Sequence, residues 1–329
     1  MKTVQLGRSG LKVSPLWLGS MMFGHRTDEA EAGRIVAHAR EHGVNAVDTA
    51  DVYAGGKSEE IVGRLVKADR ARWIVATKCG VQTGDDPNSG GASRRWITLA
   101  AEASLKRLGT DWIDVFYLHR DDGTTPLEVT VLAMADLIRA GKIRYFALSN
   151  FAAWRIAQLC ELCRSLGIPQ PVAIQPPYSA VTRGIEVEIV PCAAAYGLGV
   201  VVYSPLARGV LTGKYSGGAV EGSRAGANDK RMMETEFRPE SIAIADKIRA
   251  HAEASGRSLT AFALRWALAN RYVSGVIGGP RTLGQWQEYV EAVAVPFSKE
   301  DDAFVDALVL PGHSSTHGYT DPAYPVTGR

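Results

Sequence analysis

The stretch IDVFYLHRDDGTTPLEVTVLAMADLIRAGKIRYFALSN, residues 113–150, decides the predicted fold class. It begins with the apolar run Ile113–Leu118 and ends with a second run, Ile143–Leu148, and both are rich in the β-branched and aromatic residues typical of strands. Between them, apolar residues share one face of a helix: Leu127, Val131, Met134 and Ile138. A strand, a helix and a second strand in this order predict two parallel strands joined by a right-handed crossover.

Local signals mark where the predicted helices begin and end. Thr125–Glu128 is typical of a capping box with proline at the first helical position, and Gly141 is predicted to end that helix. Ser93 is predicted to cap an earlier helix that ends at Gly109. Ser58, which two glutamates follow, is predicted to start another.

The same unit repeats along the chain. Its eight apolar runs are Pro15–Leu18, Val44–Val47, Trp73–Thr77, Ile113–Leu118, Ile143–Leu148, Val172–Ile174, Val200–Tyr203 and Val273–Ile277. Strands that alternate with helices in this number predict an α/β chain closed into a (β/α)8 barrel, a TIM barrel. An open doubly wound sheet is the alternative, but it usually carries Gly-x-Gly-x-x-Gly after its first strand, whereas Gly197-x-Gly199 precedes a strand here.

Segments outside the eight units complete the predicted architecture. Residues Val4–Val13 are predicted to form an N-terminal β-hairpin that could plug the bottom of the barrel. No low-complexity linker or shift in composition divides the chain, so we predict one domain over residues 1–329, with residues 312–329 as a C-terminal extension.

Composition and charge exclude several classes of protein. The chain has 329 residues, of which 46% are hydrophobic and 22% charged, as expected of a globular protein and not of a disordered one. Its net charge of +2 is too small to indicate a nucleic-acid or anionic-membrane partner. Four cysteines contain no pair of C-x-x-C motifs and so form no zinc or disulfide framework. Cys160 and Cys163 make one such motif within a helical pattern, which favours two half-buried helix cysteines over a redox or metal role. Since no signal sequence or membrane span is evident, we expect a cytoplasmic protein.

The functional residues of a barrel are expected where its strands end, because barrel active sites lie at the carboxyl ends of the strands. The residues at these positions are Ser20 and Met21, Asp48, Lys78, His119, Ser149 and Asn150, Gln175, Tyr203 and Ser204, and Gly278 and Gly279. Asp48, Lys78 and His119 are difficult to explain as core residues, since charged groups are seldom buried without a partner. A salt bridge at the rim beside a solvated histidine is the alternative.

The presence of Tyr53 favours a chemical role for Asp48, Lys78 and His119. A phenol has a pKa near 10 and exchanges protons near neutral pH only where a nearby cation favours the phenolate. Lys78, held by Asp48, can supply that cation, and His119 can position an incoming carbonyl oxygen. The four residues together predict a site that protonates an oxyanion as it forms.

Five segments of the chain resemble the aldo-keto reductases, in the order expected for that family. They are Gly43–Gly63, Ala76–Lys78, Leu118–Arg120, Gly141–Phe151 and Tyr203–Tyr215, and the last resembles the cofactor-gripping segment of the bacterial and channel-associated branches. The resemblance implies that Tyr53 is the general acid, that Lys78 lowers its pKa and that Asp48 pairs with Lys78. It also implies that His119 orients the substrate carbonyl. Relatives that reduce carbon–carbon double bonds have glutamate in place of His119, so carbonyl reduction is favoured.

The resemblance also implies a set of NADPH-binding residues. Tyr203 would stack on the nicotinamide, whose carboxamide would be held by Ser149, Asn150 and Gln175. The pyrophosphate would be lined by Ser204, Leu206, Arg208 and Lys214, with Ser223 and Arg224 as weaker candidates. The complete predicted cofactor set is Ser20, Met21, Asp48, Ser149, Asn150, Gln175, Tyr203, Ser204, Pro205, Leu206, Arg208, Lys214, Ser223, Arg224, Gly279, Arg281, Gln285 and Glu288.

The segment before the last predicted helix has two interpretations. Thr282–Gln285 is typical of a capping box, which needs no ligand. Gly279-Pro280-Arg281, however, places a guanidinium beside a helix N-terminus, where an anion is already favoured. The resemblance assigns Arg281, Gln285 and Glu288 to the adenosine 2′-phosphate and the adenine. Tyr289 departs from the family pattern, which often has asparagine there.

The sequence therefore predicts an NADP-dependent oxidoreductase that reduces aldehyde or ketone carbonyls to alcohols, or runs the reverse oxidation. A small carbonyl compound is the expected partner, while nucleic acid and membrane are not expected and homo-oligomer formation is left open. The alternative from another class is a cofactor-binding regulatory subunit, because channel β-subunits share this branch. A metal-dependent barrel hydrolase has no support, since no cluster has metal-ligand spacing and no metal is predicted.

Overall fold

The computed structural model describes residues 1–326, which form two compact units. The first unit comprises Met1–Pro176, Glu188–Val202 and Tyr272–Val290, and the second comprises Pro177–Val187, Tyr203–Arg271 and the chain from Glu291. Residues 327–329 of the predicted C-terminal extension lie outside the described residues. That the whole chain is a single domain stays a prediction.

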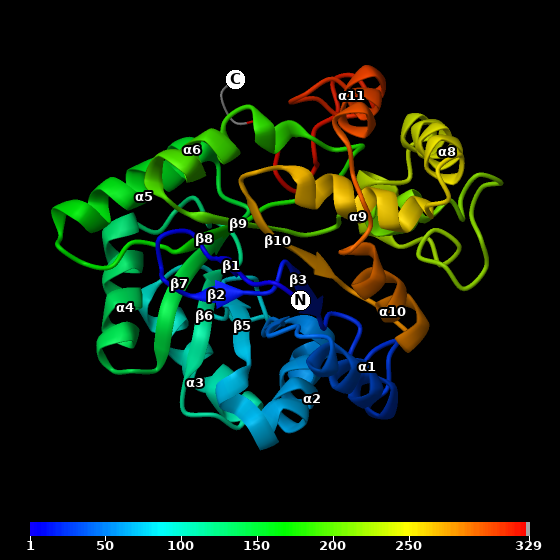
Figure 1. Cartoon of the computed structure of the whole chain (residues 1–329). Helices are drawn as coiled ribbons and strands as arrows, with labels where there is room; N and C mark the ends of the chain where they lie inside the picture. The colour runs from blue at the N-terminus through cyan, green and yellow to red at the C-terminus, as the bar shows by residue number, and fades with distance from the viewer. Residues whose placement is uncertain (327–329) are drawn as a thin grey trace. The chain divides into compact units, whose positions relative to one another are not determined.

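The first unit contains a closed barrel of parallel strands, which confirms the predicted (β/α)8 fold (Figure 1). The eight strands are β3 (Leu16–Gly19), β4 (Ala46–Asp48), β5 (Ile74–Cys79), β6 (Ile113–Leu118), β7 (Ile143–Ser149), β8 (Ala173–Gln175), β9 (Gly199–Val202) and β10 (Val273–Gly278). Each matches a predicted run, because a parallel strand is covered on both faces and its sequence is almost continuously apolar. β10 pairs with both β9 and β3, which closes the barrel.

The predicted N-terminal hairpin is also confirmed. β1 (Val4–Gln5) pairs antiparallel with β2 (Lys12–Val13), with Val4 opposite Val13. The hairpin is fixed to the barrel unit by backbone bonds, since the amide of Arg8 donates to the carbonyl of Gly197 at 2.9 Å.

Helices follow the strands of the first unit and lie outside the barrel (Figure 1). They are α1 (Glu29–Glu41), α2 (Lys57–Val66), α3 (Arg94–Leu108), α4 (Leu127–Arg139), α5 (Ala153–Ser165), α6 (Ile189–Tyr196) and most of α10 (Leu283–Ala292). Short 3-10 segments η1 (Tyr53–Gly56) and η2 (Lys67–Arg72) flank α2. Gly63 lets α2 approach α3 closely, because a Cβ there would lie 2.2 Å from the carbonyl oxygen of Leu108.

Two of the predicted helix starts are wrong in detail. Ser93 caps α3 and Gly109 ends it, as predicted. Thr125 does not cap α4, because its hydroxyl donates to Asp122 at 2.6 Å and Pro126 occupies the N-cap. Ser58 lies inside α2, and its hydroxyl bonds to Ser20 and Thr49 instead of a backbone amide. In both cases another side chain takes the hydroxyl that capping would use: Asp122, three residues earlier, for Thr125, and residues distant along the chain for Ser58.

The second unit is mainly helical and includes the C-terminal segment. Its elements are η3 (Gly184–Glu186), η4 (Ala207–Thr212), α7 (Lys230–Thr235), α8 (Pro239–Glu253), α9 (Leu259–Ala269) and α11 (Lys299–Leu308). The helix predicted to be the last, α10, is therefore followed by another, which Ser298 and Asp301 start with a capping box. Within this unit the C-terminal segment is attached by the ion pair between Asp321 and Arg231, at 2.7 Å.

Candidate active site

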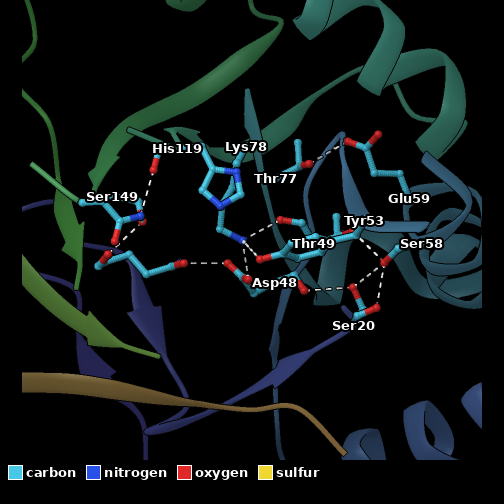
Figure 2. Close-up of polar contacts among 12 residues, drawn as sticks. Ser20, Asp48, Thr49, Tyr53, Ser58, Glu59, Thr77, Lys78, His119 and Ser149 are labelled. Carbon is cyan, nitrogen blue, oxygen red and sulfur yellow. Dashed lines mark hydrogen bonds and ion pairs between the residues drawn. The ribbon is translucent and has the colours of Figure 1, made fainter. Parts of the chain in front are cut away.

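A buried ammonium group, that of Lys78 in β5, lies at the centre of the site (Figure 2). Its Nζ donates to Oδ1 of Asp48 at 2.5 Å, to the carbonyl of Thr49 at 2.7 Å and to the phenol oxygen of Tyr53 at 3.3 Å. Burial alone would lower the pKa of Lys78, but the charge of Asp48 and the bond to Tyr53 raise it above its usual value. The group is therefore a cation at neutral pH.

The carboxylate that holds this cation is fixed on its other side. Oδ2 of Asp48 accepts a hydrogen bond of 2.8 Å from the side-chain amide of Gln175, at the end of β8. The alternative of a salt bridge at the barrel rim is wrong, since the side chains of Asp48 and Lys78 are 3% and 0% exposed. A pair buried this deeply is costly to desolvate and depends on such additional bonds.

Tyr53 is positioned by the loop that follows β4. The amides of Thr49 and Asp51 donate to the carbonyls of Ala76 and Lys78, so the loop continues the pairing of β4 with β5. Immediately after Tyr53 the backbone of Ala54 takes the left-handed conformation, with φ at 50°. A non-glycine residue in that region is strained, and such strain is frequent where a functional side chain must be aimed.

His119 follows β6 and lies beside Tyr53, with the two ring centroids 6.1 Å apart and the ring planes at 81°. Burial, and then the charges of Lys78 and Arg120, lower the pKa of His119 to about 3. The imidazole is therefore neutral at physiological pH. Its Nδ1 is buried without a hydrogen-bond partner among the described residues.

A network of hydroxyl groups connects the end of β3 and helix α2 to the loop that follows Asp48. Ser20, after β3, donates to the carbonyl of Asp48 at 2.9 Å, and its hydroxyl lies 2.8 Å from that of Ser58. Ser58 in turn lies 2.8 Å from the hydroxyl of Thr49 (Figure 2). Met21, the neighbour of Ser20, is half-buried. Ser20 thus contacts the backbone of Asp48 and not its carboxylate.

The three residues predicted to hold a carboxamide lie together at the ends of β7 and β8. Ser149 donates to the carbonyl of Gln175 at 2.8 Å. Asn150 donates to Ser149 at 3.0 Å and to the carbonyl of His119 at 2.9 Å. Asn150 has a φ of 58°, so its side chain leaves the strand end in a sharp turn. These amide and hydroxyl groups connect β6, β7 and β8 around the Lys78–Asp48 pair.

The residues predicted to bind the adenosine lie near the N-terminus of α10. Arg281 donates its amide to Oε1 of Gln285 at 2.8 Å, and its carbonyl accepts from Thr27 at 3.0 Å. Gly279 is exposed and Glu288 is half-buried. The amide of Leu283 donates to Glu31 at 2.6 Å, so a carboxylate from α1 already contacts this helix N-terminus.

The remaining predicted cofactor residues belong to the second unit. In the segment that follows Tyr203, the non-glycine residues Ser204, Ala207 and Arg208 have φ between 45° and 56°. Pro205 and Leu206 are buried, and Nε of Arg208 is buried without a hydrogen-bond partner among the described residues. A buried Nε without a partner, held by a strained backbone, is a donor that an anion could use.

Other predicted members of this set have partners within the second unit. The carbonyl of Tyr203 accepts from the amide of Tyr178 at 3.1 Å. The ammonium of Lys214 lies 5.1 Å from the centre of the Tyr215 ring. The hydroxyl of Ser223 donates to the carbonyl of Val220 at 2.5 Å, and Arg224 lies 3.8 Å from Asp229. The Ser223 hydroxyl thus closes a turn of its own loop.

Sequence reasoning missed a second polar group, which lies on the outer side of β5. The fully buried Glu59 accepts from Thr77 at 2.6 Å (Figure 2). It also accepts from Nε of Arg107 at 2.6 Å. Asp51 belongs to the same region, since burial and then the charge of Glu59 raise its pKa. The only available signal was the alternation of Thr77 and Lys78 along a strand, which sends the two side chains to opposite faces.

Residues 1–326 contain no group of three or more His, Cys, Asp or Glu side chains that could hold a metal ion. In the same part of the chain, no helix combines the length and the apolar character that crossing a bilayer requires.

Comparison with known proteins gave one family and several relatives. Residues 15–309 match the model of the aldo/keto reductase family. A probable voltage-gated potassium channel subunit beta of Arabidopsis thaliana is 37% identical over 302 residues, which cover 90% of this chain and 92% of the relative. The uncharacterized oxidoreductase YrpG of Bacillus subtilis is 35% identical, with 91% and 93% covered. The versiconal hemiacetal acetate reductase of Aspergillus parasiticus is 31% identical, with 94% and 98% covered.

Proposed function

The chain belongs to the aldo/keto reductase family, and on that premise we propose that it is an NADPH-dependent oxidoreductase that reduces the carbonyl of a small aldehyde or ketone to an alcohol. The observation that carries the proposal is the contact of the Lys78 ammonium with the phenol oxygen of Tyr53, at 3.3 Å. The names of two relatives, an oxidoreductase and a reductase, support the same class of activity.

In this proposal Tyr53 is the general acid. As negative charge develops on the substrate oxygen, the Tyr53 hydroxyl transfers its proton to that oxygen and becomes a phenolate. The Lys78 cation stabilises the phenolate, and Asp48 keeps Lys78 in place and charged. A proton from solvent then restores the phenol. The reverse sequence of the same proton transfers serves alcohol oxidation.

His119 has an orienting role in the proposed reaction. Because its pKa is lowered to about 3, it meets the substrate as a neutral imidazole and does not compete with Tyr53 as a proton donor. A neutral ring nitrogen that carries a hydrogen can donate a hydrogen bond to the carbonyl oxygen and hold it near Tyr53. The short spacing of the two rings, 6.1 Å between centroids, supports that geometry.

The proposed cofactor is NADPH, which when bound supplies the hydride for the substrate carbon. Among the proposed contacts in the first unit, Ser149, Asn150 and Gln175 carry the amide and hydroxyl groups suited to a carboxamide, with Ser20, Met21 and Asp48 beside them. Arg281, with Gly279, Gln285 and Glu288 near it, is proposed to meet the 2′-phosphate and adenine, since a guanidinium suits a phosphate.

The proposed contacts in the second unit are Tyr203, Ser204, Pro205, Leu206, Arg208, Lys214, Ser223 and Arg224. Tyr203 would stack on the nicotinamide ring. The buried Nε of Arg208, which has no partner among the described residues, supports a phosphate contact at that residue. A buried polar atom without a bond is costly, and an anion would satisfy it.

A second candidate function is that of a regulatory subunit that binds the cofactor. It is favoured by the relatives named as potassium channel β-subunits, two of which are 37% identical over 302 residues. The two functions differ in turnover: a subunit that serves mainly as a sensor would bind NADPH without consuming it at a useful rate.

The test is consumption of NADPH, followed by its absorbance, with a panel of aldehydes, ketones and sugars. Turnover with at least one carbonyl compound, and lower activity with NADH, is the expected result. Tight binding of NADPH with no turnover on any compound would favour the regulatory subunit instead. Failure to bind either nucleotide would exclude both candidates.

A further inference from the structure

Residues 312–324, near the end of the described chain, form a strap without a helix or strand in the second unit. The first part of this strap is fixed by hydrogen bonds. The amide of Ser315 donates to the carbonyl of Val181 at 3.0 Å, and the hydroxyl of Thr316 donates to Glu240, in α8, at 3.0 Å. The proposed reaction assigns no role to these contacts.

The second part of the strap is held by two arginines. Nη1 and Nη2 of Arg231, in α7, donate to Oδ1 and Oδ2 of Asp321 at 2.9 and 2.7 Å. Two parallel, charge-assisted bonds fix the orientation of the partners as well as their distance. The guanidinium carbon of Arg238, which precedes α8, lies 3.9 Å from the centre of the Tyr319 ring, a cation–π contact. The strap is therefore attached to α7 and to the start of α8.

Both arginines belong to the cofactor segment, residues 203–238, which carries the proposed cofactor contacts of the second unit. First burial and then the neighbouring Tyr324 and Asp321 raise the pKa of Tyr203, the residue proposed to stack on the nicotinamide. Burial would also raise the pKa of Asp321, but its ion pair and then the charge of Arg208 lower it. The strap therefore lies beside two of the proposed cofactor contacts.

The middle of the cofactor segment has little regular structure. Residues 213–229, between η4 and α7, contain no helix or strand, and α7 itself has only six residues. A helix this short has little stability of its own, so its position depends on tertiary contacts. The ion pair between Arg231 and Asp321 is such a contact, and its side chains are 34% and 21% exposed. The strap thus helps to fix the part of the segment that local structure leaves loose.

We propose that Arg231 and Asp321 are positioning residues for the cofactor: their ion pair latches the strap to α7, keeps the cofactor segment closed over bound NADPH and sets the rate at which NADPH leaves. An enclosed cofactor leaves only from the open state, so its dissociation rate rises with the fraction of protein that is open. Weakening the latch raises that fraction. This role rests on the proposed function, because that function places NADPH against the cofactor segment.

The first test is the rate at which NADPH leaves the full-length protein, followed by its fluorescence after mixing with excess NADP+. Asp321→Asn removes the charge of the latch but keeps the side-chain oxygen that accepts from the amide of Ala323 at 2.9 Å. NADPH should leave this variant about fivefold faster than the wild type, because a partly exposed ion pair contributes about that factor to an equilibrium.

Exchanging the two charges separates the latch from a general loss of structure. Arg231→Asp alone should speed the release of NADPH at least as much as Asp321→Asn does. Adding Asp321→Arg to it restores a pair of opposite charges and should return the release rate towards that of the wild type. Glu161→Gln removes a carboxylate that pairs with Arg164 at 2.9 Å on α5, in the first unit, and should leave the release rate unchanged.

Limited digestion of the cofactor-free protein measures opening of the strap itself. Chymotrypsin cleaves after tyrosine, and Tyr319 is half-buried, so cleavage there requires the strap to open. Because proteolysis follows the population of the open form, cleavage after Tyr319 should be about fivefold faster in Asp321→Asn. Mass spectrometry of the fragments identifies the cleaved bond.

Each contrary result overturns a stated part of the proposal. Equal cleavage of Asp321→Asn and the wild type would overturn the latch. Faster cleavage with an unchanged rate of NADPH release, or no recovery when the charges are exchanged, would overturn its role in holding the cofactor. A wild type that binds no NADPH would overturn the proposed function and the positioning role with it.

Discussion

The ammonium of Lys78 donates a hydrogen bond of 3.3 Å to the phenol oxygen of Tyr53. The two residues are brought together by neighbouring strands, because Lys78 lies in β5 and Tyr53 follows β4 in a loop whose amides bond to β5. The same ammonium is held by Asp48 at 2.5 Å, so a carboxylate, a cation and a phenol form a continuous chain of contacts. In the proposed function this chain makes the phenol an effective acid.

Asp48→Asn should destabilise the protein by about 3 kcal/mol, because it leaves the Lys78 cation buried without a counter-charge. The double variant Asp48→Asn with Lys78→Met should recover most of that loss, since it removes the cation as well. Urea denaturation of the wild type, Asp48→Asn and the double variant measures both effects. Equal stability of Asp48→Asn and the wild type would mean that the pair contributes nothing to the fold.

The same ion pair predicts how stability depends on alkaline pH. Folding raises the pKa of Lys78 above its unfolded value near 10.4. The ion pair therefore makes its full contribution to the free energy of unfolding below that pH. It should be lost as the pH rises through the higher pKa of the folded state. Stability of the wild type between pH 9 and 11, compared with that of the double variant, isolates this contribution.

His119 should stay neutral across the physiological range, because its pKa is lowered to about 3. In protein labelled with carbon-13 at the histidines, the ring signal assigned to His119 by its loss in His119→Asn should not move between pH 5 and 8. His25 is exposed and serves as the internal control. A His119 signal that titrates near pH 6.5 would contradict the neutral imidazole.

Asp51→Asn should change the pH dependence of stability. The pKa of Asp51 is raised to about 7 from an unfolded value near 3.9, so its protonated form favours the folded state. The wild type should therefore lose a few kcal/mol of stability between pH 4 and 7, and no more from this group above that. Urea denaturation at each pH gives the free energies of unfolding of the wild type and Asp51→Asn, and the difference between them measures the effect. If the difference in stability between the wild type and Asp51→Asn did not vary with pH, the Asp51 carboxylate would be solvated in the folded protein.

The sequence predicts this fold well, and for physical reasons it also singles out four residues, Asp48, Tyr53, Lys78 and His119, that the structure brings together. Parallel barrel strands are apolar throughout, and a charged residue at the end of such a strand, such as Lys78, has few explanations other than function. Contacts between segments distant along the chain are not predictable in this way. Glu31 accepts a hydrogen bond from the amide of Leu283, which is 252 residues away in the sequence. The hydroxyl of Ser58 bonds to the hydroxyls of Ser20 and Thr49 and does not cap its helix. Local patterns carry no information on such pairings.

Arg281→Ala should raise the Michaelis constant for NADPH by about one to two powers of ten and change that for NADH little. Only NADPH carries the 2′-phosphate, and a bond to a charged group contributes roughly 1.5–3 kcal/mol. Arg95→Ala removes an equal charge from an exposed position and should affect neither constant. If Arg281→Ala weakened both cofactors equally, Arg281 would have no part in selecting between them.

The most direct test of the proposed reaction is the rate of NADPH oxidation in a single turnover by Tyr53→Phe, with a carbonyl substrate of the wild type. Loss of the general acid should lower this rate by about 100-fold or more, while the dissociation constant for NADPH stays nearly unchanged. Tyr145→Phe, which removes a hydroxyl bonded to Ser9 at 3.3 Å, should retain the wild-type rate. A near-normal rate in Tyr53→Phe would contradict the assignment of Tyr53 as the proton donor.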